Sequence, residues 1–152
     1  MKTQLRIGVL GVGNMANAFV KALNNSVNLQ HTIGMKGRTV ASTYDFIKTF
    51  PDKAQIQNWY DDQLWQDLDY WVLAVKPNQI KAASSPLINA LSQSSKPPVV
   101  VSLMAGVSIS ELEQYFPGCQ IIKVMANLGI AKSKPMFAIS AKDLSGSADT
   151  YK

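Results

Sequence analysis

Three small residues near the amino terminus, Gly11, Gly13 and Ala16, have the spacing G-x-G-x-x-A. The apolar residues 7–10 before them predict a short buried strand, and apolar residues at helical spacing follow them. Gly11 would allow a sharp turn off the strand, Gly13 would leave no Cβ between the backbone and a bound pyrophosphate, and Ala16 would let the helix approach the sheet. The helix N-terminus would then offer unpaired N–H groups to the phosphates. The pattern predicts a dinucleotide-binding corner, with an ordinary tight turn as the alternative.

A second candidate site follows the strand expected at residues 30–35, where the sequence continues with Lys36, Arg38 and Thr39 and has no acid before Asp45. In folds that prefer NAD, an acidic residue at the end of this strand binds the ribose 2′-hydroxyl, whereas an arginine accommodates the 2′-phosphate of NADP. Lys36 and Arg38 can pair with a phosphate, and Thr39 can cap the next helix. NADP(H) is therefore favoured over NAD(H), with an ordinary basic loop as the alternative.

The third candidate site is the abrupt end of a continuous apolar run over residues 70–75, which stops at Lys76 and Pro77. Such a run is typical of a strand buried on both faces of a parallel sheet. Open α/β sheets bind ligands at the carboxyl ends of their strands, so residues 74–77 are expected to line the cofactor site. For Lys76, a solvated surface position is an equally good interpretation.

Strand and helix patterns alternate along the chain with short connections. Strands are expected at 7–10, 30–35, 54–57, 70–75, 99–103, 121–125 and 136–140, and helices around 15–23 and at 39–50, 61–68, 79–91 and 108–117. This alternation predicts an α/β fold of the Rossmann type, a doubly wound, mostly parallel sheet with helices on both faces. One domain is expected over residues 1–140, and the polar residues 141–152 read as a tail or linker.

Composition excludes several classes of protein. A chain of 152 residues with 47% hydrophobic and 16% charged residues is globular and long enough for one sizeable core. The net charge of +5 is scattered along the chain, which indicates a solvated surface and no nucleic-acid partner. The longest apolar runs fall far short of the roughly 18 residues that cross a bilayer, and no signal peptide is expected.

The sequence offers no nucleophile or metal constellation. Cys119 is the single cysteine, which fits a reducing compartment, and it has no histidine near it in sequence. His31 is the single histidine and lies in an expected strand, where a structural role is favoured over catalysis. Hydride transfer needs neither group, because the cofactor carries the chemistry and the protein orients it.

Four motifs together resemble the pyrroline-5-carboxylate reductases: IGVLGVGNMA at 7–16, AVKP at 74–77, VSLMAGV at 101–107 and VMAN at 124–127. They follow the family's order and spacing over residues 4–140. The resemblance implies a cytoplasmic enzyme of proline biosynthesis, in which NADPH reduces the C=N bond of a small imine, pyrroline-5-carboxylate, to give L-proline. It also implies a homo-oligomer for an intact family member. A non-catalytic NADP-binding or sensor module and a related imine or β-hydroxyacid oxidoreductase are the alternatives.

The resemblance also assigns ligand contacts to individual residues, although it assigns no catalytic residue and no metal ligand. The cofactor-binding set comprises Leu10, Gly11, Val12, Gly13, Asn14 and Met15 at the pyrophosphate, Lys36 and Arg38 at the 2′-phosphate, Asn58 at the adenosine, Ala74, Val75, Lys76 and Pro77 at the ribose and nicotinamide, and Met104, Ala105 and Gly106 beside the nicotinamide. Val107 and Asn127 are expected to lie near the substrate.

The chain departs from the family pattern in three ways. Residues 125–129 read MANLG where Met-Pro-Asn-Thr-Pro is usual, so two prolines and a threonine hydroxyl are missing. Met104 replaces a typical alanine and would add a flexible side chain beside the cofactor. Family members also continue for roughly another hundred residues into a helical dimerisation domain that contacts the substrate carboxylate. We therefore expect this chain to bind cofactor but to reduce substrate slowly or not at all, with an exposed apolar surface at 136–139.

Overall fold

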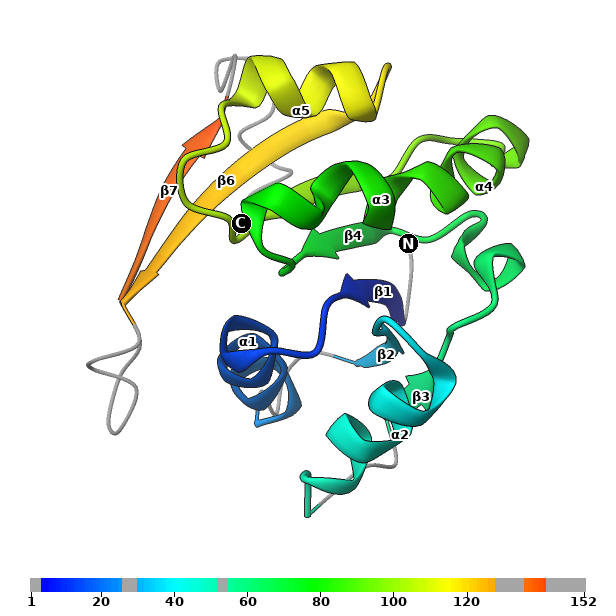
Figure 1. Cartoon of the computed structure of the whole chain (residues 1–152), viewed down its shortest axis with the longest axis vertical. Helices are drawn as coiled ribbons and strands as arrows, with labels where there is room; N and C mark the ends of the chain where they lie inside the picture. Colours follow the sequence, from blue (N-terminus) through cyan, green and yellow to red (C-terminus); the bar gives the residue numbers. More distant parts are fainter. Residues whose placement is uncertain (1–3, 26–29, 52–54, 128–135, 142–152) are drawn as a thin grey trace.

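A computed structural model describes residues 4–25, 30–51, 55–127 and 136–141, with the backbone alone for 126–127 and 136–141. The strands form one sheet in the order β3-β2-β1-β4-β5-β6-β7 (Figure 1). Their bounds are β1 Leu5–Leu10, β2 His31–Lys36, β3 Ile56–Asn58, β4 Tyr70–Leu73, β5 Val99–Ser102, β6 Gln120–Asn127 and β7 Met136–Ala141. The first six strands pair in parallel and β7 runs antiparallel to β6. The predicted Rossmann-type, mostly parallel sheet is confirmed.

Helices cover both faces of this sheet, α1 and α2 on one side and α3, α4 and α5 on the other (Figure 1). Their bounds are α1 Asn14–Asn24, α2 Val40–Lys48, α3 Ile80–Ser84, α4 Ile88–Gln93 and α5 Ile109–Tyr115, with 3-10 turns η1 Asp62–Trp65, η2 Pro77–Gln79 and η3 Ser85–Leu87. The strand order reverses between β1 and β4. In doubly wound sheets a ligand binds at such a reversal, outside the carboxyl ends of the strands.

The helix starts follow local hydrogen bonds that the sequence predicts. The Thr39 hydroxyl accepts from the Ser42 backbone N–H at 3.0 Å and begins α2. Ser108 accepts from the Glu111 N–H at 3.1 Å and begins α5, as the capping-box pattern predicts. Each bond satisfies an N–H group that the first helical turn leaves without a partner.

Two of the expected helices differ from the prediction. The single helix expected over 79–91 is broken into α3, η3 and α4, because Pro86 lies within it and cannot donate the hydrogen bond of a continuous helix. The helix expected over 61–68 is only the short turn η1, which ends before Asp67 adopts a left-handed φ of 57°. The segment from Trp59 to Leu68 therefore runs across the sheet as an irregular strip.

Two apolar clusters fill the space between the sheet and its covering layers. Alternation along the strands separates them, since Trp71 and Leu73 of β4 join one cluster while Val72 between them joins the other. The cluster beneath α1 and α2 contains Val9, Ala16 and Phe46, among others. The cluster beneath α3 and α5 includes three buried tryptophans, Trp59, Trp65 and Trp71.

The tryptophans lie over glycines in the neighbouring strands. Gly8 of β1 pairs with Gly34 of β2, and a Cβ built on Gly34 would lie 1.7 Å from the Trp59 ring. The indole N–H of Trp65 donates to the Trp59 carbonyl at 2.9 Å, and the Trp71 N–H donates to the Trp65 carbonyl at 3.2 Å. Because Gly8 and Gly34 have no side chains, the segment from Trp59 to Leu68 can pack flat against the sheet where a helix would otherwise lie.

Cys119 is buried in the same cluster, and this burial raises the pKa of its thiol to about 11. At pH 8 only about one thiol in a thousand would be ionised, and the thiolate is the reactive form. We expect an aromatic disulfide reagent to label the folded chain at least about 100-fold more slowly than the denatured chain.

Because the unfolded thiol ionises near 9.0, the free energy of unfolding should also fall as pH rises from 9 toward 11. Equal labelling rates for the folded and denatured chain would contradict this burial.

Among the described residues, no helix combines the length and apolar character required to cross a bilayer. The predicted domain boundary at residue 140 falls within β7, and the predicted tail lies outside the described residues after Ala141. The domain division therefore stays a prediction.

Candidate cofactor site

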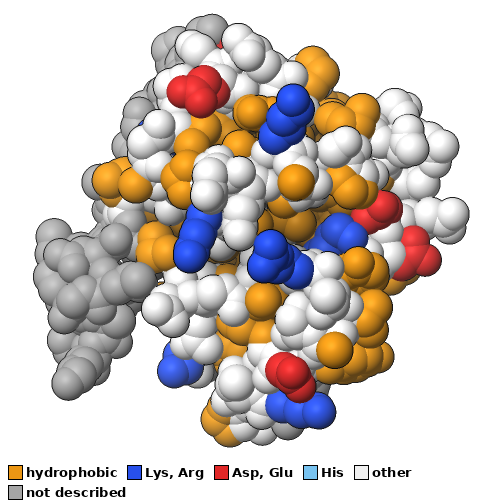
Figure 2. Space-filling model, in the orientation of Figure 1, with side chains coloured by type: hydrophobic (Ala, Val, Ile, Leu, Met, Phe, Trp, Pro, Cys, Tyr) orange, Lys and Arg blue, Asp and Glu red, His pale blue; other side chains and the backbone are white. Residues whose placement is uncertain are grey.

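A cleft of about 490 Å³ opens where the strand order reverses. It is bounded by the turn after β1, the end of β2, the end of β4 and the first turns of α3. Its lining residues are Leu10, Gly11, Val12, Gly13, Lys36, Gly37, Arg38, Tyr60, Ala74, Val75, Lys76, Gln79, Ala82, Ala83 and Pro86. Figure 2 shows Lys and Arg side chains gathered around the centre of this face of the molecule. An elongated anionic ligand would fit both the shape and the charge of the cleft.

The turn after β1 has the geometry that a pyrophosphate needs. Gly11 adopts a φ of +118°, and a Cβ there would lie 2.5 Å from the carbonyl oxygen of Ala74. Gly13 caps α1, and a Cβ built on it would meet no heavy atom within 4 Å. Ala16 is fully buried against the sheet. Open space therefore lies beside the backbone at Gly13, at the N-terminus of a helix whose first turn contains no acidic residue.

Asn14 and Met15, which the sequence assigns to the pyrophosphate, are the first two residues of α1. Asn14 is exposed, whereas Met15 is half-buried and packs against the cluster beneath α1. Neither residue lines the cleft. Their contacts with the pyrophosphate stay a prediction.

The end of β2 carries two cations with different surroundings. Lys36 is buried, its ammonium donates to the Tyr60 carbonyl at 2.6 Å, and it lies 2.8 Å from the Asp62 carboxylate. Arg38 is exposed, and among the described residues its guanidinium makes no hydrogen bond or ion pair. Both residues line the cleft, but only Arg38 presents an uncompensated charge to it.

Asn58 lies beside the cleft and does not line it. Its side-chain oxygen accepts from the Tyr60 N–H at 3.0 Å, and its amide nitrogen donates to the Val40 carbonyl at 3.4 Å. The Tyr60 hydroxyl in turn donates to the Arg38 carbonyl at 3.2 Å. Asn58 therefore positions the strand-end segment at 58–62 against the turn after β2, and its predicted contact with adenosine stays a prediction.

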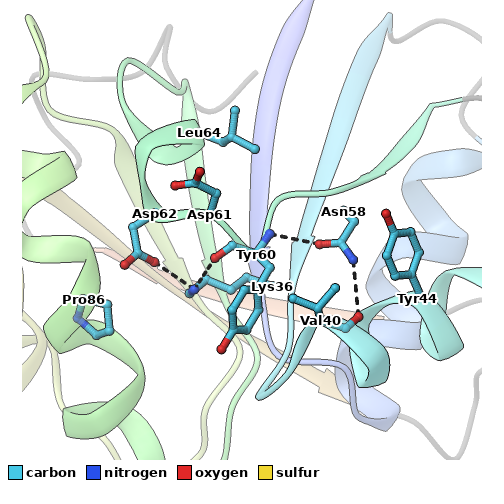
Figure 3. A pocket seen from close by; sticks show the side chains of 9 residues that line it. All are labelled: Lys36, Val40, Tyr44, Asn58, Tyr60, Asp61, Asp62, Leu64 and Pro86. Atoms are coloured by element: carbon cyan, nitrogen blue, oxygen red, sulfur yellow. Dashed lines mark hydrogen bonds and ion pairs between the residues drawn. The ribbon is translucent and has the colours of Figure 1, made fainter.

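A second hollow of about 600 Å³ adjoins the cleft and shares Lys36, Tyr60 and Pro86 with it (Figure 3). Asn58, Asp61 and Asp62 contribute its polar lining, and Val40, Tyr44 and Leu64 its apolar lining. The Lys36 ammonium lies between Asp62 and the Tyr60 carbonyl at the boundary of the two hollows (Figure 3). Two acidic side chains thus lie next to the end of β2, where the local sequence contains only basic residues.

The end of β4 forms the opposite wall of the cleft. The Ala74 N–H donates to the Leu10 carbonyl at 2.8 Å, which fixes this strand end beside the glycine turn. Ala74 and Val75 are half-buried and Lys76 is exposed, and all three line the cleft. Pro77 begins η2 and does not line the cleft, because it faces solvent. Three of the four residues expected here are therefore brought to the cofactor side.

The segment after β5 is arranged differently from the expectation at Met104. This side chain is only 3% exposed and packs in the cluster beneath α3 and α5, which holds it in the core. Ala105 and Gly106 are exposed, with Gly106 at a φ of 77°, and Val107 is buried. None of the four lines the cleft, and their contacts with nicotinamide or substrate stay predictions.

Asn127 is the last residue of β6, and its side chain lies outside the described residues, as do those of 136–139. Its proximity to substrate and the exposed apolar surface of β7 stay predictions. Within the described part of the chain, no group of His, Cys, Asp and Glu could hold a metal ion. His31 is buried at the start of β2, far along the strand from the glycine turn.

Sequence reasoning missed the wall made by Tyr60, Gln79, Ala82, Ala83 and Pro86. The last four follow directly from the end of β4, where η2 leads into α3. The sequence did contain a signal for this wall. Two consecutive alanines lie one turn into the helix that follows a ligand-binding strand end, and their small side chains would let a ligand approach the helix closely. Tyr60 gave no such signal, because its position depends on how the segment after β3 folds back over β2.

Comparison with known proteins supports an NADP-binding domain. Residues 6–106 match the family model described as "NADP oxidoreductase coenzyme F420-dependent". The pyrroline-5-carboxylate reductase of Staphylococcus haemolyticus (strain JCSC1435) is 28% identical over 112 residues, which cover 72% of this chain and 39% of that protein. That of Staphylococcus aureus (strain COL) is 28% identical over 127 residues, covering 81% and 44%. The chain thus spans less than half the length of these relatives.

Solved structures show the same fold. The NADP-bound pyrroline carboxylate reductase of Plasmodium falciparum has a TM-score of 0.71 at 19% identity, covering 96% of this chain and 51% of that one. The pyrroline-5-carboxylate reductase of Coxiella burnetii has a TM-score of 0.71 at 25% identity, covering 95% and 53%. The resemblance that the motifs indicate is confirmed, and NADP(H) fits the open glycine turn and the free Arg38. The chain belongs to the NADP oxidoreductase family described as coenzyme F420-dependent.

Proposed function

We propose that this chain is the cofactor-binding part of an NADPH-dependent reductase that converts pyrroline-5-carboxylate to L-proline. The observation that carries the proposal is the cleft at the strand reversal, where the open Gly13 backbone and the free Arg38 guanidinium lie on one surface. The four motifs and the relatives named pyrroline-5-carboxylate reductase support this choice of substrate. Proline biosynthesis in the cytoplasm and homo-oligomer assembly of an intact protein are parts of the same proposal.

The residues of this chain bind and orient the cofactor. The N–H groups at the start of α1 hold the pyrophosphate, and Arg38 pairs with the 2′-phosphate. Ala74, Val75 and Lys76 form the wall beside the ribose and nicotinamide. When bound, NADPH supplies the hydride that adds to the imine carbon. Ala105, Gly106, Val107 and Asn127 are proposed to lie toward the substrate, whose nitrogen takes a proton from water or from a group outside this chain.

A non-catalytic NADP-binding or sensor module is the second candidate. It is favoured by residues 125–129, where the family's prolines and threonine are absent. This candidate and the reductase share the cofactor site, so cofactor binding alone does not separate them. They differ in whether any hydride from NADPH reaches an imine carbon. A related imine or β-hydroxyacid oxidoreductase would transfer hydride to a different substrate.

The separating experiment follows deuterium from labelled NADPH into L-proline during long incubations of the 152-residue chain with pyrroline-5-carboxylate. We expect slow transfer or none, well below the roughly 10 per second of a typical enzyme. Orientation of substrate can lower a barrier by about 7 to 11 kcal/mol, and the region that the resemblance assigns to substrate orientation lies outside this chain.

The control is Arg38→Asp, which should lose the transfer at subsaturating NADPH. Labelled proline above the protein-free control would exclude the non-catalytic module, and a chain that binds no NADPH would contradict the proposed function. Turnover near 10 per second would instead show that the residues present here suffice for orientation.

A further inference from the structure

The positive charge of Lys36, at the end of β2, is neutralised by an ion pair with Asp62. The Lys36 ammonium lies 2.8 Å from Asp62 Oδ1, donates to the Tyr60 carbonyl, and sits 4.2 Å from the centre of the Tyr60 ring (Figure 3). The Lys36 side chain is 9% exposed and that of Asp62 is 40% exposed. The ammonium charge is therefore compensated before any ligand arrives.

This arrangement changes what a 2′-phosphate meets at the end of β2. Arg38 offers an uncompensated guanidinium, whereas the charge of Lys36 is cancelled by a carboxylate that would itself repel the phosphate. A cofactor without the 2′-phosphate is neither attracted by Arg38 nor repelled by Asp62 at this position. Asp62 consequently acts on NADPH and leaves NADH almost unaffected.

Asp62 is not needed to hold its own segment in place. The Trp65 side chain is fully buried and its N–H donates to the Trp59 carbonyl. Asp61, not Asp62, caps η1 by accepting from the Gln63 N–H at 3.0 Å. The Tyr60 hydroxyl also bonds the turn after β2. Removing the Asp62 charge should thus leave the fold intact, while Lys36 keeps its bond to the Tyr60 carbonyl.

We propose that Asp62 is a specificity-determining residue, whose carboxylate withholds the Lys36 ammonium from the 2′-phosphate and so limits the preference for NADPH over NADH. The inference rests on the cofactor site of the proposed function and concerns that site's selectivity. It predicts that the chain is less selective than its two basic residues suggest, and that one neutral substitution makes it more selective.

The test is Asp62→Asn in the full 152-residue chain, with calorimetric titration of NADPH and NADH. NADPH should bind about fivefold more tightly, the size of one partly screened ionic contact, and NADH should change less than about twofold. Asp61→Asn is the matched control, because it removes a neighbouring charge from the same hollow and keeps a side chain that can cap η1. It should leave the ratio of the two affinities near that of the parent.

A second arm replaces Lys36 by methionine, which keeps the apolar stem and removes the ammonium. In the Lys36→Met background, Asp62→Asn should lose most of its effect on the affinity ratio. An unchanged ratio in Asp62→Asn, or equal weakening of both cofactors, would overturn the inference while leaving the cofactor site standing. A parent chain that binds neither cofactor would overturn the proposed function and this inference together.

Discussion

Replacing Gly34 by alanine is expected to destabilise the fold by about 4 to 8 kcal/mol. The new Cβ would lie 1.7 Å from Cε3 and 1.8 Å from Cδ2 of Trp59, which is 5% exposed. Overpacking a core costs about 1 to 3 kcal/mol, and displacing a buried tryptophan costs about 3 to 5 kcal/mol more. A domain is stable by only about 5 to 15 kcal/mol in total. Thermal unfolding followed by near-ultraviolet circular dichroism should show a transition far below that of the parent, or none, for this variant.

Gly13→Ala is the matched control for this substitution. Its Cβ would meet no heavy atom within 4 Å, and its φ of −91° suits alanine. This variant should fold like the parent and bind NADPH more weakly, because the methyl group occupies the space left for the pyrophosphate. A melting temperature of Gly34→Ala within a few degrees of the parent would show that Trp59 does not lie on the β2 surface as described.

Arg38→Asp is expected to weaken NADPH binding about 100-fold, which corresponds to roughly 3 kcal/mol. The substitution removes a guanidinium that lines the cleft and has no side-chain partner in the described part of the chain, and it places a carboxylate beside the dianionic 2′-phosphate. NADH should be affected far less, because an acidic residue at this strand end can accept a hydrogen bond from the ribose hydroxyl. Fluorescence titration of both cofactors measures the two affinities.

Lys76→Asp provides the comparison for Arg38→Asp, since it makes the same change of charge at the opposite wall of the cleft. It should weaken NADPH and NADH to similar extents, because both cofactors carry the same pyrophosphate and nicotinamide. If Arg38→Asp also weakened the two cofactors equally, the guanidinium would act as a general positive charge and would not recognise the 2′-phosphate.

The features that the sequence predicted well are those set by neighbours along the chain. The turn at Gly11 and Gly13, the buried β4 run and the Ser108 cap depend on local backbone geometry and on apolar runs. The glycine turn and the end of β4 meet in one cleft because parallel strands place their carboxyl ends at the same edge of a sheet. The main walls of the site could therefore be predicted without coordinates.

The features that the sequence did not predict depend on contacts between distant segments. The Asp62 carboxylate reaches Lys36 only because the segment after β3 folds back over β2. The same folding brings the Asn58 side-chain amide into hydrogen bonds with the backbone of Tyr60 and Val40. Met104 packs among buried residues that come from distant parts of the chain. Residue type and spacing identified a basic position at Lys36 correctly, but they could not show that its charge was already compensated.

The most direct test of the central claim is calorimetric titration of the unmodified 152-residue chain with NADPH and, separately, with NADH at the same ionic strength. The Arg38 guanidinium, which is unpaired among the described residues, and the lack of an acid in the sequence at 36–39 predict that NADPH binds at least about tenfold more tightly, a difference of roughly 1.4 kcal/mol. Equal affinities for the two cofactors would contradict the assignment of this strand end as a 2′-phosphate site.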